Sequence, residues 1–213
     1  MDRQPIERLA VQVMEEHRWH TAVIYGSWAR GDATPASDVD LLCVRETGAT
    51  ARDARVVGGA YLDAFVYPES ALESLDLSFL RILGGVVVRE RDGVGSKLLA
   101  RVREMHDRGP PPMPDDERLA LVTWSQKMLD RFRASHGVDV DYRRMYLVVR
   151  ALEDYFALRN AWYEGEKVAF AWLCEHDPST YNLFESASQL SDSALADLVG
   201  AVYRVAPNAG RVG

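Results

Sequence analysis

The sequence predicts an α/β (α+β) domain followed by an all-α helical bundle. Short β-rich runs and helical patterns are mixed through the first half of the chain, whereas the second half shows helical spacing only. Between the halves, residues 106–117 read HDRGPPPMPDDE, and three consecutive prolines cannot continue a helix. We therefore expect a domain at residues 1–108, a proline-rich linker at 109–114 and a helical bundle at 115–213.

The elements of the first half follow from local patterns. Apolar residues from Ile6 to Met14 recur at helical spacing and predict an amphipathic helix. Runs rich in β-branched and aromatic residues predict strands at 21–25, 39–45, 60–67 and 86–89. A short helix is expected at 27–30 and a longer one at 96–106.

In the second half nothing reads as a strand. Helical patterns begin at Asp115, Asp139, Glu166, Pro178 and Asp192. We therefore expect a bundle of helices, the second of which spans residues 139–163.

Composition limits the classes of function. The chain has 213 residues and a formal charge of −7, which argues against a nucleic-acid binder, because phosphate contacts need a basic face. The N-terminus has no apolar signal core and no window is long enough to span a bilayer, so we expect a cytoplasmic protein without a membrane partner. Cys43 and Cys174 lie in apolar segments and are expected to be free, buried thiols.

A pair of aspartates stands at the start of the second predicted strand. Side chains alternate along a strand, so Asp38 and Asp40 are expected on one face. Two carboxylates this close repel each other unless a cation lies between them, and Mg²⁺ prefers such oxygen ligands. Asp63 lies within the next predicted strand, where an acid is costly unless it is paired or bound to metal. We expect Asp38, Asp40 and Asp63 to be catalytic metal ligands.

A Gly-Ser pair closes the first predicted strand. Gly26 allows the backbone to approach a ligand closely, and the following helix start offers free N–H groups to an anion. Ser27 adds a hydroxyl donor. We expect a phosphate to bind here, beside the metal.

These residues together resemble the nucleotidyltransferase superfamily related to DNA polymerase beta. The shared pattern is Gly26-Ser27, then Asp38-x-Asp40 with Arg30-Gly31 and Ser37 in place, and a later strand acid at Asp63. The resemblance covers roughly residues 5–105. It implies a small mixed sheet, three acids that bind Mg²⁺, one of which helps to deprotonate the acceptor, and a Gly-Ser element that holds the triphosphate. Arg30 and Ser37 join the expected nucleotide-binding residues.

The second half offers one further acid. A predicted apolar stripe runs along helix 139–163 through Tyr142, Met145, Tyr146, Val149, Leu152 and Phe156. Glu153 falls within that stripe and Asp154 at its edge. Glu153 is therefore either ion-paired, with Arg150 or Arg144, or a general base that faces the acceptor.

Residues 162–181 resemble the helical C-terminal domain of aminoglycoside nucleotidyltransferases of the streptomycin/spectinomycin type. The similar positions are Trp162-Tyr163, Gly165-Glu166-Lys167, Trp172-Leu173, Pro178 and Tyr181. The resemblance implies that Lys167 contacts nucleotide phosphates, although a solvated lysine in a first helical turn is the alternative. The bundle is accordingly expected to bind the acceptor.

The sequence thus predicts a Mg²⁺-dependent nucleotidyltransferase that releases pyrophosphate. We expect it to transfer AMP from ATP to a hydroxyl of a small molecule, with an aminoglycoside-like acceptor as one option. Two alternatives stay open: a protein-modifying enzyme of the antitoxin type, and a catalytically silent nucleotide-binding module. No nucleic acid is expected as a partner, and a homodimer is left open.

Overall fold

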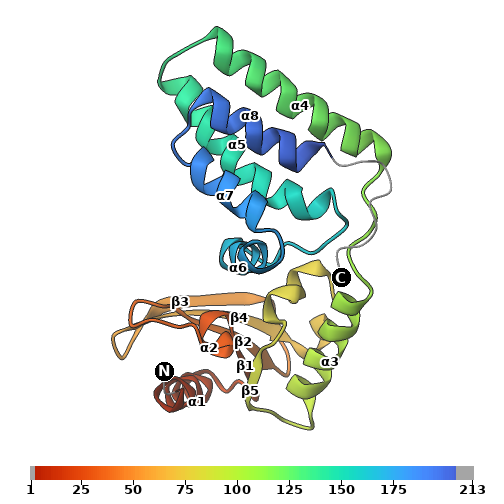
Figure 1. Ribbon diagram of the computed structural model, residues 1–213. Coiled ribbons are helices and arrows are strands. Elements are labelled where there is room, and N and C mark those ends of the chain that lie inside the picture. The colour runs from red at the N-terminus through yellow and green to blue at the C-terminus, as the bar shows by residue number, and fades with distance from the viewer. Residues whose placement is uncertain (1–2, 205–213) are drawn as a thin grey trace. The chain divides into compact units, whose positions relative to one another are not determined.

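The computed structural model describes residues 3–204 and divides the chain into two compact units, residues 1–108 and 109–213. The first unit mixes helices with a sheet and the second is helical (Figure 1). Separate hydrophobic cores lie inside them, because buried side chains of one unit pack with others of the same unit.

The first unit is built around a five-stranded mixed sheet with the strand order β3-β4-β2-β1-β5. β2 and β4 pair in parallel, and the other neighbours pair antiparallel. The predicted α/β (α+β) domain with a small mixed sheet is therefore confirmed. Its elements, in chain order, are α1 (Gln4–His17), β1 (Thr21–Tyr25), α2 (Gly26–Arg30), β2 (Val39–Arg45), β3 (Ala51–Val57), β4 (Ala60–Pro68), the 3-10 helices η1 (Glu69–Leu72) and η2 (Leu77–Ile82), β5 (Val86–Arg89) and α3 (Val94–Asp107).

The two faces of this sheet have different coverings. Ile24, Leu41 and Ala64 share a core with residues of α1, which lies along one face of the sheet (Figure 1). On the other face, Leu42 and Val44 share a core with residues of η1, η2 and α3. Because side chains alternate along each strand, the residues directly before and after Ile24, Leu41 and Ala64 point to the second face.

β3 and β4 form a hairpin whose first strand was not expected from the sequence. Val57 pairs with Ala60, so Gly58 and Gly59 make the two-residue turn. Both have positive φ, +59° and +86°, which suits glycine and the turn types that match strand twist. β3 lies at the edge of the sheet and is mostly exposed, so it lacks the apolar pattern of a buried strand.

The second unit is a bundle of helices, and the described residues 109–204 contain no strand, as predicted. Its core comes from all of its helices. One end differs from the prediction: the second helix stops well before residue 163, and Asn160 adopts a left-handed φ of 51°, a conformation that closes helices. The helices are α4 (Asp115–Ala134), α5 (Val138–Ala157), α6 (Glu166–His176), α7 (Pro178–Ala187) and α8 (Asp192–Tyr203).

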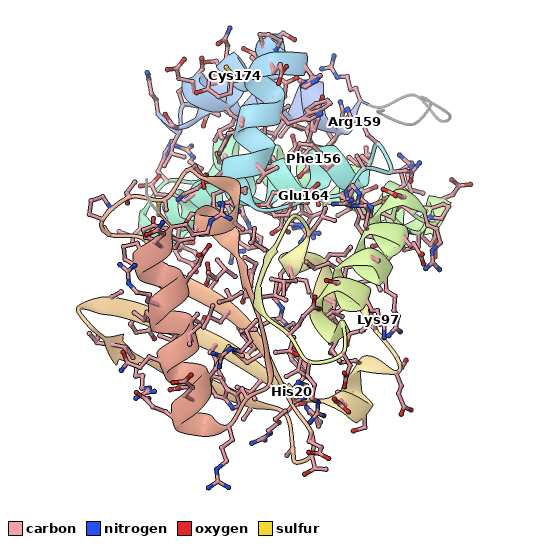
Figure 2. The ribbon with its side chains drawn as sticks, turned by 90° about the horizontal axis from the view of Figure 1, so that it is seen from below. His20, Lys97, Phe156, Arg159, Glu164 and Cys174 are labelled. Carbon is pink, nitrogen blue, oxygen red and sulfur yellow. The ribbon has the colours of Figure 1, made fainter. Side chains whose placement is uncertain are left out.

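Two smaller expectations concern membranes and thiols. None of the helices within residues 3–204 is long and apolar enough to cross a bilayer. Both cysteines are free, and Cys43 is buried as predicted. The prediction for Cys174 was wrong, because its side chain is exposed on α6 (Figure 2). Neighbouring helical positions point about 100° apart, so Leu173 is buried while Cys174 faces outward.

Candidate active site

Asp40 and Asp63 lie next to each other on neighbouring strands. They are register partners in the parallel pairing of β2 with β4, and their side chains leave the same face of the sheet. The residues that flank them, Val39, Leu41 and Leu62, are fully buried on the opposite face. Strand pairing and burial therefore fix the two carboxylates side by side.

The charge of Asp40 is partly buried and faces other acids. Burial raises the pKa of Asp40 to about 6, and the negative charges of Asp63 and Asp38 act in the same direction, whereas Arg30 opposes them. A carboxylate with this surplus of negative charge favours a cation beside it.

Gly26 stands at the start of α2, where a larger residue has no room. Its φ is +67°, and a Cβ built on it would lie 2.3 Å from Oδ2 of Asp40. Any side chain at this position would displace the Asp40 carboxylate. The missing Cβ therefore lets the β1–α2 turn approach Asp40 closely.

Ser27 follows at this turn and is 8% exposed. Within the described part of the chain its hydroxyl makes no hydrogen bond to another residue, while its carbonyl accepts from the backbone N–H groups of Gly31 and Asp32 at 2.9 and 3.1 Å. The backbone of Ser27 thus closes the short helix, and its hydroxyl stays available to a ligand.

Asp63 makes a bidentate ion pair with Arg52 of β3. Nε of Arg52 donates to Oδ1 of Asp63 at 2.6 Å and Nη2 donates to Oδ2 at 2.7 Å. The same guanidinium lies 5.1 Å from the ring centroid of Phe65, and the Arg81 guanidinium lies 4.1 Å from it. Arg52 was not predicted as a site residue, because no strand was expected at β3, which carries it.

The end of α2 and the loop that follows it hold the other predicted residues of this unit. Asp38 is exposed and lies one residue before β2, so only its charge is seen to act on Asp40. Arg30 pairs loosely with Asp32 at 3.4 Å. Ser37 closes a turn, since its Oγ accepts from the N–H of Thr34 at 2.9 Å. A phosphate contact by Arg30 or Ser37 stays a prediction.

The donor chemistry fits a divalent cation, although no complete cage is present. Asp40 and Asp63 offer neighbouring carboxylate oxygens, the ligands that Mg²⁺ prefers. Among residues 3–204, no three or more His, Cys, Asp and Glu side chains gather closely enough to hold a metal by themselves. Mg²⁺ commonly uses one or two carboxylates and completes its shell with substrate phosphates and water, so two adjacent aspartates suffice for the fit.

The acids of the helical unit are arranged differently from the prediction. The expected stripe on α5 was wrong in part, because Tyr142, Tyr146 and Val149 are 68%, 53% and 67% exposed. The helix buries its neighbouring face, which includes Leu147, Ala151 and Tyr155.

Glu153 accordingly lies at a half-exposed position. Its carboxylate accepts from Nη1 of Arg150 at 3.0 Å, which is the ion-pair alternative stated from the sequence. Its role as a base stays a prediction. The buried acid is instead Asp154, which accepts from the hydroxyl of Tyr203 at 2.7 Å and lies 3.0 Å from Nε of Arg150. Lys167 is exposed in the first turn of α6, and its phosphate contact is likewise a prediction.

The arrangement of the first unit's site limits what it can bind. Neighbouring carboxylates on a mixed sheet, beside a Gly-Ser turn that approaches one of them, suit a cation together with a phosphate ligand. Residues 8–82 match the nucleotidyltransferase domain family. This part of the chain, which contains Gly26, Asp40 and Asp63, thus belongs to the nucleotidyltransferase superfamily.

Two further comparisons complete this result. The chain is similar to the crystal structure, at 1.90 Å resolution, of a nucleotidyltransferase-like protein from Exiguobacterium sibiricum 255-15. The TM-score is 0.41 and the identity 15%, and the match covers 92% of this chain and 75% of that chain. Comparison with curated proteins gives no significant match.

Proposed function

We propose that this protein transfers a nucleoside monophosphate, AMP from ATP, to a hydroxyl of a small molecule and releases pyrophosphate. The observation that carries the proposal is the pairing of Asp40 with Asp63 beside Gly26, inside the region that matches the nucleotidyltransferase domain. An acidic pair at this place suits a cation and a triphosphate together, because the phosphates complete the cation's ligand shell.

The candidate site residues of the first unit have distinct parts in this proposal. Gly26 lets the β1–α2 turn approach the triphosphate, and the Ser27 hydroxyl donates a hydrogen bond to a phosphate oxygen. Asp40 and Asp63 would hold Mg²⁺, which when bound neutralises charge on the attacking and leaving oxygens. The resemblance adds Asp38 as a third ligand.

The chemical step is a displacement at the α-phosphate. The acceptor oxygen bonds to the α-phosphorus, the bond to the bridging oxygen of pyrophosphate breaks, and pyrophosphate leaves with that electron pair. The proton of the hydroxyl passes to a carboxylate, for which we propose Asp63. Positioning and charge stabilisation contribute most to such a transfer, so the two fixed aspartates matter more than any nucleophilic side chain.

For the acceptor we propose a cationic, hydroxyl-rich small molecule such as an aminoglycoside. The support is the acidic balance of the chain, −7, and the resemblance of residues 162–181 to the helical C-terminal domain of aminoglycoside nucleotidyltransferases. The helical unit would supply recognition, because the nucleotidyltransferase domain binds metal and nucleotide.

The test is product formation from α-labelled ATP and Mg²⁺ with a panel of aminoglycosides and a small-molecule cell extract. We expect a labelled product of low mass and stoichiometric pyrophosphate, both lost in Asp40→Asn. The four common nucleoside triphosphates, compared in parallel, decide the base preference. Label found on protein would favour the antitoxin-type alternative, and no metal-dependent binding of any triphosphate would overturn the proposal.

A further inference from the structure

We propose that Arg52 is a competing cation at Asp63, so that a metal ion gains this carboxylate only when the guanidinium releases it. Arg52 is then a positioning residue that lowers the affinity of the site for metal alone. The inference rests on the proposed function, because it takes Asp40 and Asp63 to be metal ligands.

The first argument is the geometry of the pair. Both carboxylate oxygens of Asp63 accept short hydrogen bonds from Arg52, at 2.6 and 2.7 Å. A bidentate pair with a guanidinium is one of the stronger polar contacts in proteins. A divalent cation that approaches the Asp63 carboxylate from the side of the guanidinium must therefore replace at least one of these bonds.

The second argument is the unequal fixation of the two partners. The side chain of Asp63 is 16% exposed and belongs to a strand that is paired on both sides, whereas the side chain of Arg52 is 56% exposed on the edge strand. Movement of Arg52 costs little packing, and movement of Asp63 would disturb the sheet. The guanidinium is hence the partner that leaves.

The metal ion alone and the metal ion with a triphosphate differ in the charge that they bring beside Arg52. A metal ion alone would place two further positive charges beside Arg52, while a metal ion with a triphosphate brings negative charge that the released guanidinium can meet. The ring of Phe65, 5.1 Å from the guanidinium carbon, keeps Arg52 near the site after release. Arg52 should oppose the metal alone and not the metal–nucleotide complex.

Calorimetric titration with Mn²⁺, without nucleotide, tests this on the full chain. We expect Arg52→Gln to bind Mn²⁺ about tenfold more tightly than the wild type, which corresponds to about 1.4 kcal/mol. Arg52→Lys keeps the charge without the bidentate contact and should fall between them. In the presence of saturating ATP the difference should shrink to less than about threefold.

Arg55→Gln is the matched control. Arg55 lies on the same strand and is 41% exposed, but it pairs with Glu16 and Asp53 at 2.6 and 3.0 Å instead of Asp63. Its substitution should leave the Mn²⁺ affinity unchanged. An equal gain in affinity from both variants would mean that net charge, not the Asp63 contact, decides the result, and would overturn the inference.

A second readout uses the wild type, so it holds even where a variant fails to fold. The Nε–H resonance of Arg52 should shift as Mg²⁺ saturates the site, and should stay fixed in Asp40→Asn. An unchanged resonance at saturation overturns the inference. Equal Mn²⁺ affinity in wild type and Arg52→Gln, together with loss of binding in Asp40→Asn, overturns the inference alone and supports the proposed function. Absence of Mn²⁺ binding in all variants, with no nucleotide transfer, overturns both.

Discussion

Asp40 and Asp63 are register partners across the parallel pair of β2 and β4, with their carboxylates on one face of the sheet. Parallel partners come from strands that are not consecutive: β3 and its hairpin turn lie between them in the chain. The like charges are therefore brought together by the topology of the sheet, and they stay together because buried neighbours hold both strands. The repulsion between these two carboxylates should therefore lower the stability of the protein.

Substitution Asp40→Asn should stabilise the protein in EDTA by about 1 kcal/mol at pH 7. The pKa of Asp40 in the fold, about 6, lies above its unfolded value of about 3.9. In the wild type, the Asp40 carboxyl contributes stability while it is protonated, so this contribution is present below about pH 4 and is lost as the pH rises through about 6. The full shift would give about three times this figure, which partial solvation of the carboxyl reduces. Urea unfolding between pH 4 and pH 8 measures both the gain and the loss of pH dependence.

The same variant should lose most metal-dependent turnover, by roughly 10²-fold or more, since one ligand for the cation is gone. A circular dichroism spectrum identical to the wild type serves as the control for folding. Full turnover by Asp40→Asn would remove Asp40 from the site.

Ser27→Ala should weaken ATP binding by about 5- to 150-fold in the presence of Mg²⁺, with a nearly unchanged melting temperature. The hydroxyl makes no hydrogen bond to a residue within 3–204, so its loss costs the fold little, while a charge-assisted bond to phosphate is worth about 1–3 kcal/mol. Calorimetry with ATP measures the affinity.

Ser96→Ala is a suitable comparison for Ser27→Ala, because Ser96 lies in the first turn of α3 and donates to Glu90 at 2.7 Å. It should lower stability and leave ATP affinity unchanged. If Ser27→Ala behaved in this way instead, Ser27 would be structural.

Glu153→Gln separates the two roles stated for Glu153. As a general base it would contribute about 10²–10⁴ in rate. As a half-exposed partner of Arg150 it contributes at most about 1 kcal/mol to stability and nothing to the rate. The structure favours the second role, so we expect a wild-type single-turnover rate once an acceptor is known. A loss of 10²-fold with unchanged unfolding would establish the base.

Asp177→Asn should destabilise the protein by about 1 kcal/mol at pH 7. Burial raises the pKa of Asp177, but hydrogen bonds from Ser179, Thr180 and Tyr155 outweigh it and bring the value to about 2. This pKa is below the unfolded value, so the stabilising contribution is present above about pH 4 and is lost as the pH falls toward 2. The figure is discounted because the carboxylate is partly solvated.

Unfolding in urea at pH 7 and pH 3 measures this difference. Asp177 caps the N-terminus of α7, and Glu185 lies on the exposed side of that helix. Glu185→Gln is therefore the control and should change the stability at neither pH. A wild-type acid transition in Asp177→Asn would show that other carboxylates govern acid unfolding.

Much of the first unit could be predicted from the sequence because its strands are strongly patterned. β1, β2 and β5 have the predicted ends, and most of their residues are apolar, many of them β-branched. β3 was missed because its edge position carries the polar residues Arg52, Asp53 and Arg55, so it lacks the apolar pattern of a buried strand. The pair Gly58-Gly59 between two runs was a hairpin signal that would have found it.

The candidate site was predictable as a set of residue types but not as a geometry. Gly26, Asp40 and Asp63 carry a recognisable pattern, whereas the parallel register of β2 with β4 depends on tertiary pairing. The misplaced stripe on α5 has a similar reason. Tyr142, Met145 and Val149 are apolar at helical spacing, and periodicity alone does not say which of two adjacent faces is buried.

The Gly58–Gly59 turn sets which side of β3 shares a face with Asp40 and Asp63. In the present register Ala54 stands opposite Asp63 and Arg52 opposite Phe65. Side chains on a strand alternate, so the insertion of one residue into this turn, if taken up as a slip of β3, would turn Arg52 to the α1 side. A loop of two glycines, four residues before Asp63 in the chain, thereby controls which charge β3 presents to Asp63. Variants with a longer or shorter loop would thereby move the guanidinium toward Asp63 or away from it, while Arg52 itself stays unchanged.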